Sequence, residues 1–82
     1  MPPNLSVSLA RLTKLATEVL EDHLGMIAPL IAEEVAAEAK ASGPQSEQQV
    51  LAYFLSHLRL ALPADLDKER IIDALHARYR NA

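Results

Sequence analysis

The chain contains no cysteine, no tryptophan and only two glycines in 82 residues. Without cysteine there can be no disulfide, no thiolate metal ligand and no thiol nucleophile. Gly25 and Gly43 stand alone and cannot form the glycine-rich loop that holds phosphates in nucleotide-binding proteins. The longest uncharged runs, such as residues 48–58, are far shorter than the roughly 20 apolar residues that a membrane-spanning helix needs. These absences exclude several classes of enzyme and predict a protein without a membrane span.

Positive charge is also scarce. Eight lysines and arginines stand against eleven aspartates and glutamates, which gives a formal net charge of −3. Residues 1–44 carry three basic and six acidic side chains, so the acidity belongs to the first half of the chain. Because nucleic-acid binding relies on neutralising phosphates, no nucleic-acid partner is expected. Residues 1–4 lack the basic start of a secretory signal, and a cytoplasmic location is the default expectation.

Leucine and alanine dominate what is present, with fourteen of each against three aromatic residues. This composition favours helices, and the length suits one domain, residues 1–82. We expect a loose lead-in at residues 1–5. The apolar periodicity predicts an all-α fold, a compact bundle of four amphipathic helices spanning about 6–24, 26–41, 46–61 and 66–79.

Each predicted helix has an apolar stripe at helical spacing. The first stripe comprises Leu9, Leu12, Ala16, Val19, Leu20 and Leu24. The second comprises Ile27, Leu30, Ile31, Val35 and Ala39, with Glu33, Glu34 and Glu38 on the solvent side. The third comprises Val50, Leu51, Phe54, Leu55 and Leu58, and the fourth Ile71, Ile72, Leu75 and Tyr79. Together these four stripes are sufficient to close one core.

The breaks between the helices carry familiar signals. Gly25 follows the first stripe, where glycine tolerates a left-handed conformation past a helix end. Pro29 is acceptable only in the first turn of the next helix. Residues 42–44, Ser-Gly-Pro, form the clearest turn. Ser46 and Gln49 have the spacing of a capping box, in which two side chains satisfy free backbone donors at a helix start.

The sequence holds little that suggests catalysis or metal binding. The histidines, His23, His57 and His76, occupy three different predicted helices, and no pair has the i, i+4 spacing of two ligands on one face. Asp65 and Asp67 are better explained as caps of the last helix than as a calcium loop. No serine–histidine–aspartate signature is recognisable. We therefore expect a non-enzymatic protein without a cofactor or metal.

Some apolar residues remain outside the four stripes, and such surplus often marks a contact site. The predicted interface consists of Leu15, Met26, Tyr53 and Leu60, with His57 and Arg59 at its rim. Helix-face packing against another protein, or self-association as a homodimer, is the expected mode of action.

Three stretches resemble a known pattern: residues 24–28 (Leu-Gly-Met-Ile-Ala), residues 34–39 (Glu-Val-Ala-Ala-Glu-Ala), and residues 62–65 (Leu-Pro-Ala-Asp) leading to 71–75 (Ile-Ile-Asp-Ala-Leu). The chain is similar in these to a small helical domain at the C-terminal ends of some bacterial signalling proteins, including kinases and response-regulator-like proteins. It departs at Met26, where that pattern favours proline. The resemblance implies an accessory or interaction role in signalling and assigns no catalytic residue.

Two alternatives stay open. A bundle with a core of leucine, isoleucine and phenylalanine can hold an apolar molecule between its helices, as a small regulatory domain would. A nucleic-acid-binding regulator would need its arginines, Arg59, Arg70, Arg78 and Arg80, on one face.

Overall fold

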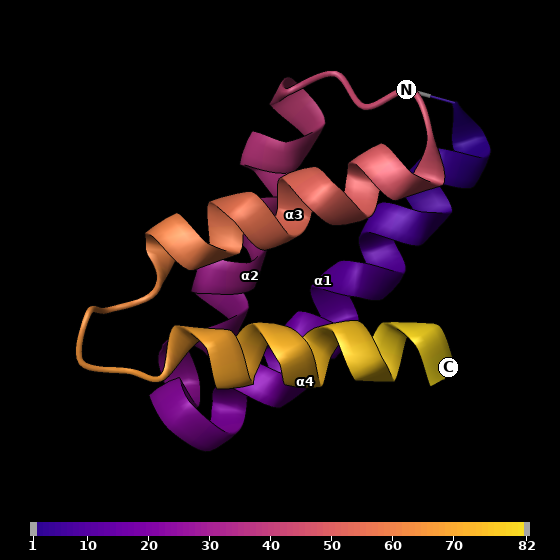
Figure 1. Ribbon diagram of the computed structural model, residues 1–82. Coiled ribbons are helices and arrows are strands. Elements are labelled where there is room, and N and C mark those ends of the chain that lie inside the picture. The colour runs from indigo at the N-terminus through magenta and orange to yellow at the C-terminus, as the bar shows by residue number, and fades with distance from the viewer. Residues whose placement is uncertain (1, 82) are drawn as a thin grey trace.

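Four α-helices and one short 3₁₀ turn make up the structure (Figure 1). The computed structural model describes residues 2–81. Its elements are α1 (Pro3–Leu24), η1 (Gly25–Ile27), α2 (Ala28–Ala41), α3 (Glu47–Ala61) and α4 (Lys68–Asn81). The predicted all-α bundle of four helices is confirmed, with the second predicted helix divided into η1 and α2.

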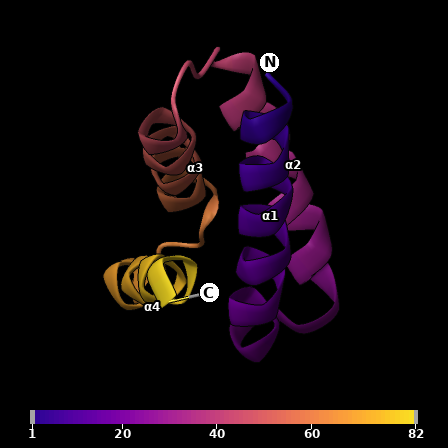
Figure 2. The same cartoon turned by 90° about the vertical axis from the view of Figure 1, so that its right-hand side faces the viewer.

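The helices form two layers that cross. In Figure 2, α1 and α2 are seen along their length as a hairpin, whereas α3 and α4 are seen close to end-on beside them. α3 packs against both helices of the hairpin, and α4 packs mainly against α1. The Cα radius of gyration is 11.6 Å, which matches the value of about 11.7 Å expected for a compact domain of this length.

Three of the four predicted stripes form the core. All members of the α4 stripe are buried, as are the α1 residues other than Leu24, which is half-buried. In α3 the fully buried residues are Val50, Phe54 and Leu58, while Leu51 and Leu55 lie at the edge of the core. Phe54 has no exposed surface, and its burial contributes roughly 2–3 kcal/mol of hydrophobic stabilisation.

The stripe predicted for α2 is wrong at its start. Ile27 and Leu30 are 49% and 65% exposed, and the buried face of α2 consists of Ala28, Ala32, Val35 and Ala39. These alanines have no exposed surface because α2 lies directly along α1. Small side chains permit this close approach, whereas a leucine would hold the helices apart. Leu30 is therefore displaced to the outer side.

The expected lead-in at residues 1–5 is wrong for residues 3–5, and its first residue lies outside the part of the chain that the structure describes. α1 begins at Pro3, and Leu5 is buried with 3% exposure. Proline suits the first turn because its φ is already helical and its missing N–H is not needed there. The carbonyl of Pro2 accepts hydrogen bonds from the amides of Leu5 and Ser6 at 3.0 and 3.1 Å. The N-terminal residues thus extend the first helix.

Gly25 determines where α1 ends. Its φ of +60° and ψ of −129° are accessible to glycine and strained for other residues. The chain then passes through η1 and enters α2 with Pro29 in the first turn, as predicted. This turn brings the start of α2 to the surface at the foot of the α1–α2 hairpin (Figure 1).

The starts of α3 and α4 are capped by side chains. The amide of Gln49 donates to Ser46 Oγ at 3.1 Å, whereas Gln49 Oε1 accepts from the amide of Gln45 at 2.7 Å instead of from Ser46. At α4 the amide of Arg70 donates to Asp67 Oδ1 at 3.2 Å. Asp67 is therefore the cap, and α4 spans 68–81 in place of the predicted 66–79.

Polar contacts hold the end of α4 against α1 and α3. Arg11 donates to the carbonyl of Tyr79 at 2.8 Å, and its guanidinium lies 4.5 Å from the centre of the Tyr79 ring. The Tyr79 hydroxyl donates to Glu47 Oε1 at 2.6 Å. Burial raises the pKa of Tyr79, and the hydrogen bond to the Glu47 carboxylate raises it further. Tyr79 thereby joins three helices.

Candidate functional site

Large exposed apolar side chains gather at the start of α2. Met26 is 95% exposed, Leu30 is 65% exposed and Ile27 is 49% exposed. Leu30 follows Ile27 by three residues and Met26 by four, across the junction of η1 and α2. We call Met26, Ile27, Pro29 and Leu30 the Met26–Leu30 patch. Its position follows from the alanine face of α2, which occupies the side toward α1.

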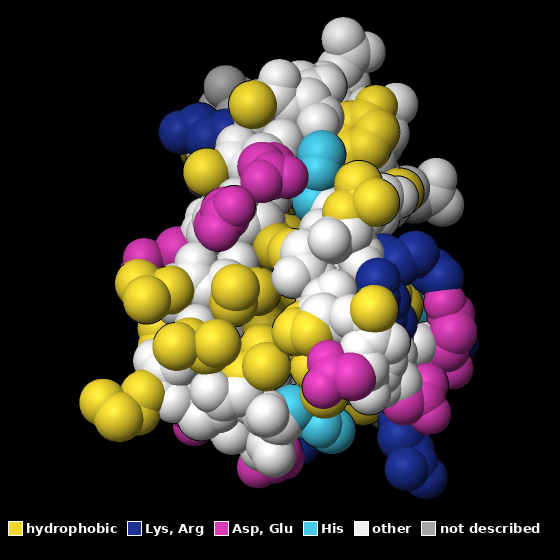
Figure 3. Space-filling model, turned by 90° about the vertical axis from the view of Figure 1, so that its left-hand side faces the viewer, with side chains coloured by type: hydrophobic (Ala, Val, Ile, Leu, Met, Phe, Trp, Pro, Cys, Tyr) yellow, Lys and Arg dark blue, Asp and Glu magenta, His cyan; other side chains and the backbone are white. Residues whose placement is uncertain are grey.

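The surface beside Met26 is hollowed. An open pocket of about 370 Å³ is lined by Glu21, Gly25, Met26 and Pro29. Figure 3 shows hydrophobic side chains gathered on the side of the molecule where η1, α2 and the C-terminal end of α3 lie. A contiguous apolar area of this kind is the surface feature that most often marks a binding site on a small protein.

The other predicted interface residues are distributed over α1 and α3. Leu60 is 80% exposed near the C-terminal end of α3. Leu15 and Tyr53 are half-buried and pack against the core. Of the four apolar residues in the predicted interface, Met26 and Leu60 are thus the most accessible to a partner.

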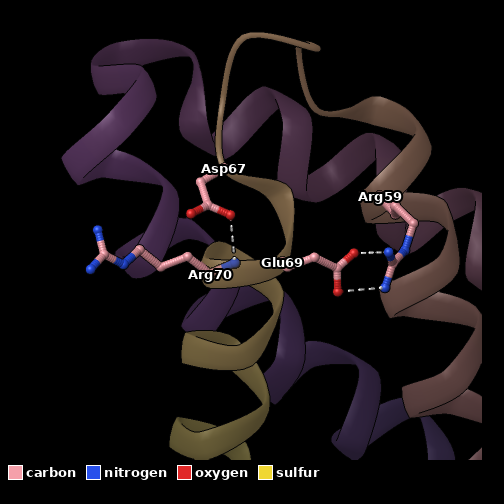
Figure 4. A network of polar contacts seen from close by, with 4 residues as sticks. All are labelled: Arg59, Asp67, Glu69 and Arg70. Carbon is pink, nitrogen blue, oxygen red and sulfur yellow. Dashed lines mark hydrogen bonds and ion pairs between the residues drawn. The ribbon is translucent and has the colours of Figure 1, made fainter.

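Arg59 of α3 forms an ion pair with Glu69 of α4. Figure 4 shows its guanidinium paired with both carboxylate oxygens of Glu69. Asp67 caps α4 beside this pair through the amide of Arg70. The ion pair joins α3 to α4 across the link between them, which gives Arg59 a role in the bundle itself. Exposed pairs of this kind contribute about 0–1 kcal/mol.

His57 joins α3 to the end of α2. Its Nδ1 lies 3.0 Å from Glu38 Oε2, and its Nε2 lies 3.0 Å from Ser42 Oγ. Ser42 Oγ is also 3.0 Å from the carbonyl oxygen of Glu38. When His57 is neutral with its proton on Nδ1, the Ser42 hydroxyl donates to Nε2. When the ring carries both protons, Nε2–H donates to Ser42, whose hydroxyl then turns to the Glu38 carbonyl.

The order serine, histidine, carboxylate is that of a hydrolase triad, but the surroundings of Ser42 differ from an active site. A triad needs free N–H groups beside the nucleophile to stabilise the oxyanion. The amides of Ser42 and Gly43 donate to carbonyls of α2, and the amide of Gln45 donates to Gln49. Residue 44 is a proline and has no N–H. The three side chains therefore cap α2 and connect it to α3.

The Met26–Leu30 patch and His57 lie at opposite ends of α2. The helix has 14 residues, so its ends are about 20 Å apart. A single small contact cannot cover both. His57 and Met26, both members of the predicted interface, are separated by the length of this helix.

Carboxylates border the patch. Glu21 lines the pocket beside Met26, and Glu33 and Glu34 follow Leu30 by three and four residues. All three are exposed, and within residues 2–81 none of them forms an ion pair. The sequence has no lysine or arginine between Lys14 and Lys40. The site is thus apolar at its centre and acidic at its edge.

Among residues 2–81, no three histidine, aspartate or glutamate side chains converge in a way that could bind a metal ion. No described helix combines the length and the apolar character needed to cross a bilayer.

Comparison of the chain with protein-family models, with curated proteins and with solved structures gave no match. The resemblance to the C-terminal domains of bacterial signalling proteins therefore stays a prediction.

Two parts of this arrangement differ from what the sequence predicts. Ile27 and Leu30 fall in the predicted core stripe because leucine and isoleucine are more apolar than alanine. The contacts of Ser42 and Glu38 with His57 are not predicted, since His57 lies 15 residues after Ser42. The available signal was the spacing of Ala28, Ala32, Val35 and Ala39, a second stripe that runs along the whole of α2.

Proposed function

We propose that this chain is a non-enzymatic protein–protein interaction module that acts by helix-face packing at the Met26–Leu30 patch. The exposure of Met26, 95% beside an open pocket, is the observation that carries the proposal. A flexible methionine with no internal packing role is typical of surfaces that bind protein helices. The resemblance to domains of bacterial signalling proteins supports an accessory role in signalling.

The pocket favours a protein partner over a small apolar ligand. Such a ligand would be held between helices and lose most of its surface to the protein. The pocket beside Met26 is instead open and lined by Glu21, Gly25, Met26 and Pro29 at the foot of the hairpin. It therefore suits one side chain of a partner that also covers the neighbouring Leu30.

A photocrosslinking amino acid at position 26 tests the proposal in the source cell. We expect discrete protein adducts on irradiation, and we expect Leu30→Glu in the same chain to abolish them. The control carries the crosslinker at position 7, because Val7 is 68% exposed at the far end of α1 and should give no such adduct. No adduct from position 26, or the same adducts from both positions, would contradict the proposal.

Light scattering of the purified protein over a tenfold concentration range identifies the kind of partner. A dimer that Leu30→Glu dissociates would mean that the patch packs against a second copy. A monomer together with crosslinked adducts of larger mass would mean that another protein binds there.

A further inference from the structure

We infer that the occupant of the Met26–Leu30 patch is a basic amphipathic helix of another protein, with apolar residues on one face and lysines or arginines on its flanks. This inference rests on the proposed function and adds the chemistry of the partner. It follows from the negative charge around the patch. The exposure of the apolar side chains does not by itself specify the charge of the partner.

The rim of the patch is acidic on two sides. Glu21 borders the pocket beside Met26, and Glu33 and Glu34 continue the outer face of α2 directly after Leu30. No described cation pairs with them. The start of α2 adds a partial positive charge of about half a unit, which three full carboxylates outweigh. A partner gains most there by bringing cations to the edge of its apolar stripe.

The same charges disfavour the other occupants. A second copy packed by twofold symmetry would bring the acidic rims of both copies, Glu21, Glu33 and Glu34 of each, into one interface. An anionic lipid surface and a phosphate backbone would be repelled in the same way. Figure 3 shows the basic side chains of this face set apart from the main hydrophobic group. A basic helix is the occupant that satisfies both the apolar centre and the acidic edge.

The geometry also fits a helix. Met26 of η1 and Leu30 of the first turn of α2 are both exposed, so they offer two apolar contacts where the chain enters α2. An amphipathic helix supplies apolar side chains at i, i+4 and i+7, which match such a row and the pocket beside it. Its flanking lysines or arginines would then lie over Glu33 and Glu34, one turn further along α2.

The test uses the full chain and a fluorescein-labelled peptide of about 18 residues, roughly 27 Å of helix. The peptide has leucines at helical spacing and lysines elsewhere, and binding is followed by fluorescence anisotropy. Two control peptides accompany it: the same composition in an order that breaks the stripe, and a version with glutamate in place of lysine. We expect only the first peptide to bind. Its affinity should fall when the salt concentration is raised from about 50 mM to about 500 mM.

Matched variants locate the binding. Leu30→Gln should raise Kd at least about tenfold, whereas Val7→Gln should change it less than about twofold. The two residues are 65% and 68% exposed, so the pair replaces an aliphatic side chain of similar exposed fraction at two places. Equal effects of the two substitutions would overturn the inference.

A second pair isolates the charges. The double variant Glu33→Lys with Glu34→Lys should also raise Kd at least about tenfold, because it reverses the rim. Asp65→Lys with Asp73→Lys gives the same change in net charge on exposed positions elsewhere and should have a much smaller effect. Equal losses in both doubles would show attraction by net charge alone and would overturn the inference.

The proposed function and this inference can fail separately. Crosslinked adducts at position 26 together with no binding of the lysine peptide would leave an interaction module whose partner is not basic. A dimer held by the patch would also overturn the inference. Absence of adducts would instead contradict the proposed function itself.

Discussion

At its C-terminal end α2 is hydrogen-bonded to a neighbour, because Glu38 and Ser42 both contact His57 of α3. At its N-terminal end the same helix presents Leu30 to solvent, beside the exposed Met26 of η1. Both ends share one buried face, Ala28, Ala32, Val35 and Ala39, on a helix that packs against α1 and α3. The two ends of α2 thus differ in their surroundings: the polar end contacts α3, whereas the apolar end is exposed and is where we propose that a partner binds.

The largest expected effect comes from the face that both ends share. Ala32→Leu inserts three carbons where Ala32 has no exposed surface and α1 is in contact. Overpacking of this kind costs about 1–3 kcal/mol, and we expect about 2 kcal/mol from chemical denaturation. Leu30→Ala, two residues earlier on the outside, should cost less than about 0.5 kcal/mol. If Leu30→Ala proved the more damaging, the assignment of inner and outer faces would be wrong.

The difference between these two positions shows what the sequence could specify. Leu12, Phe54 and Leu75 are large residues in regular stripes, and the sequence predicted their burial correctly. Ala32 is small, and its burial depends on how closely α1 approaches, which is a property of the assembled fold. By its apolar character Leu30 resembles a core residue, but the alanines of α2 occupy the buried side of the helix.

The site shows the same division. Met26 and Leu60 could be recognised as surplus because each lies outside a stripe. The Ser42–His57 contact could not, since it depends on how the link at residues 42–46 folds back to place α3 across α2. Local patterns therefore specify the helices, whereas the identity of each exposed face depends on tertiary packing.

A smaller effect is expected at the polar end. His57→Ala removes the contacts to Glu38 and Ser42, which are partly exposed, and we expect a loss of about 1 kcal/mol in the free energy of unfolding. His23→Ala is the matched control, because His23 is exposed at the apolar end and should have little influence. Amide hydrogen exchange at residues 42–46 should accelerate only in the His57 variant. If the two variants lost the same free energy of unfolding and showed the same amide exchange, the contacts of His57 would not distinguish the two ends of α2.

Beyond the polar end, the chain enters α3 through Glu47, whose contact with Tyr79 predicts a dependence on alkaline pH. Burial raises the pKa of Tyr79 above 10.0, so its contribution is fully present below pH 10. Above that pH the unfolded chain loses the phenol proton first, and stability falls as pH rises through the folded pKa. Tyr79→Phe should lessen this alkaline fall, whereas Tyr53→Phe should retain it. Urea unfolding between pH 8 and about 11 measures the difference.

The smallest expected effect concerns chemistry at Ser42. Because the amides of Ser42, Gly43 and Gln45 are all engaged, none of these three can stabilise an oxyanion formed at Ser42, and such donors contribute about 10²–10³ in rate. We therefore expect Ser42→Ala to leave hydrolysis of p-nitrophenyl acetate unchanged. The exposed imidazole of His23 can itself attack this activated ester, so His23→Ala defines the background. A fluorophosphonate that labelled Ser42, with the labelling lost in His57→Ala, would show an activated nucleophile. The polar end would then be the reactive one, and the assignment of tasks to the two ends of α2 would have to be reversed.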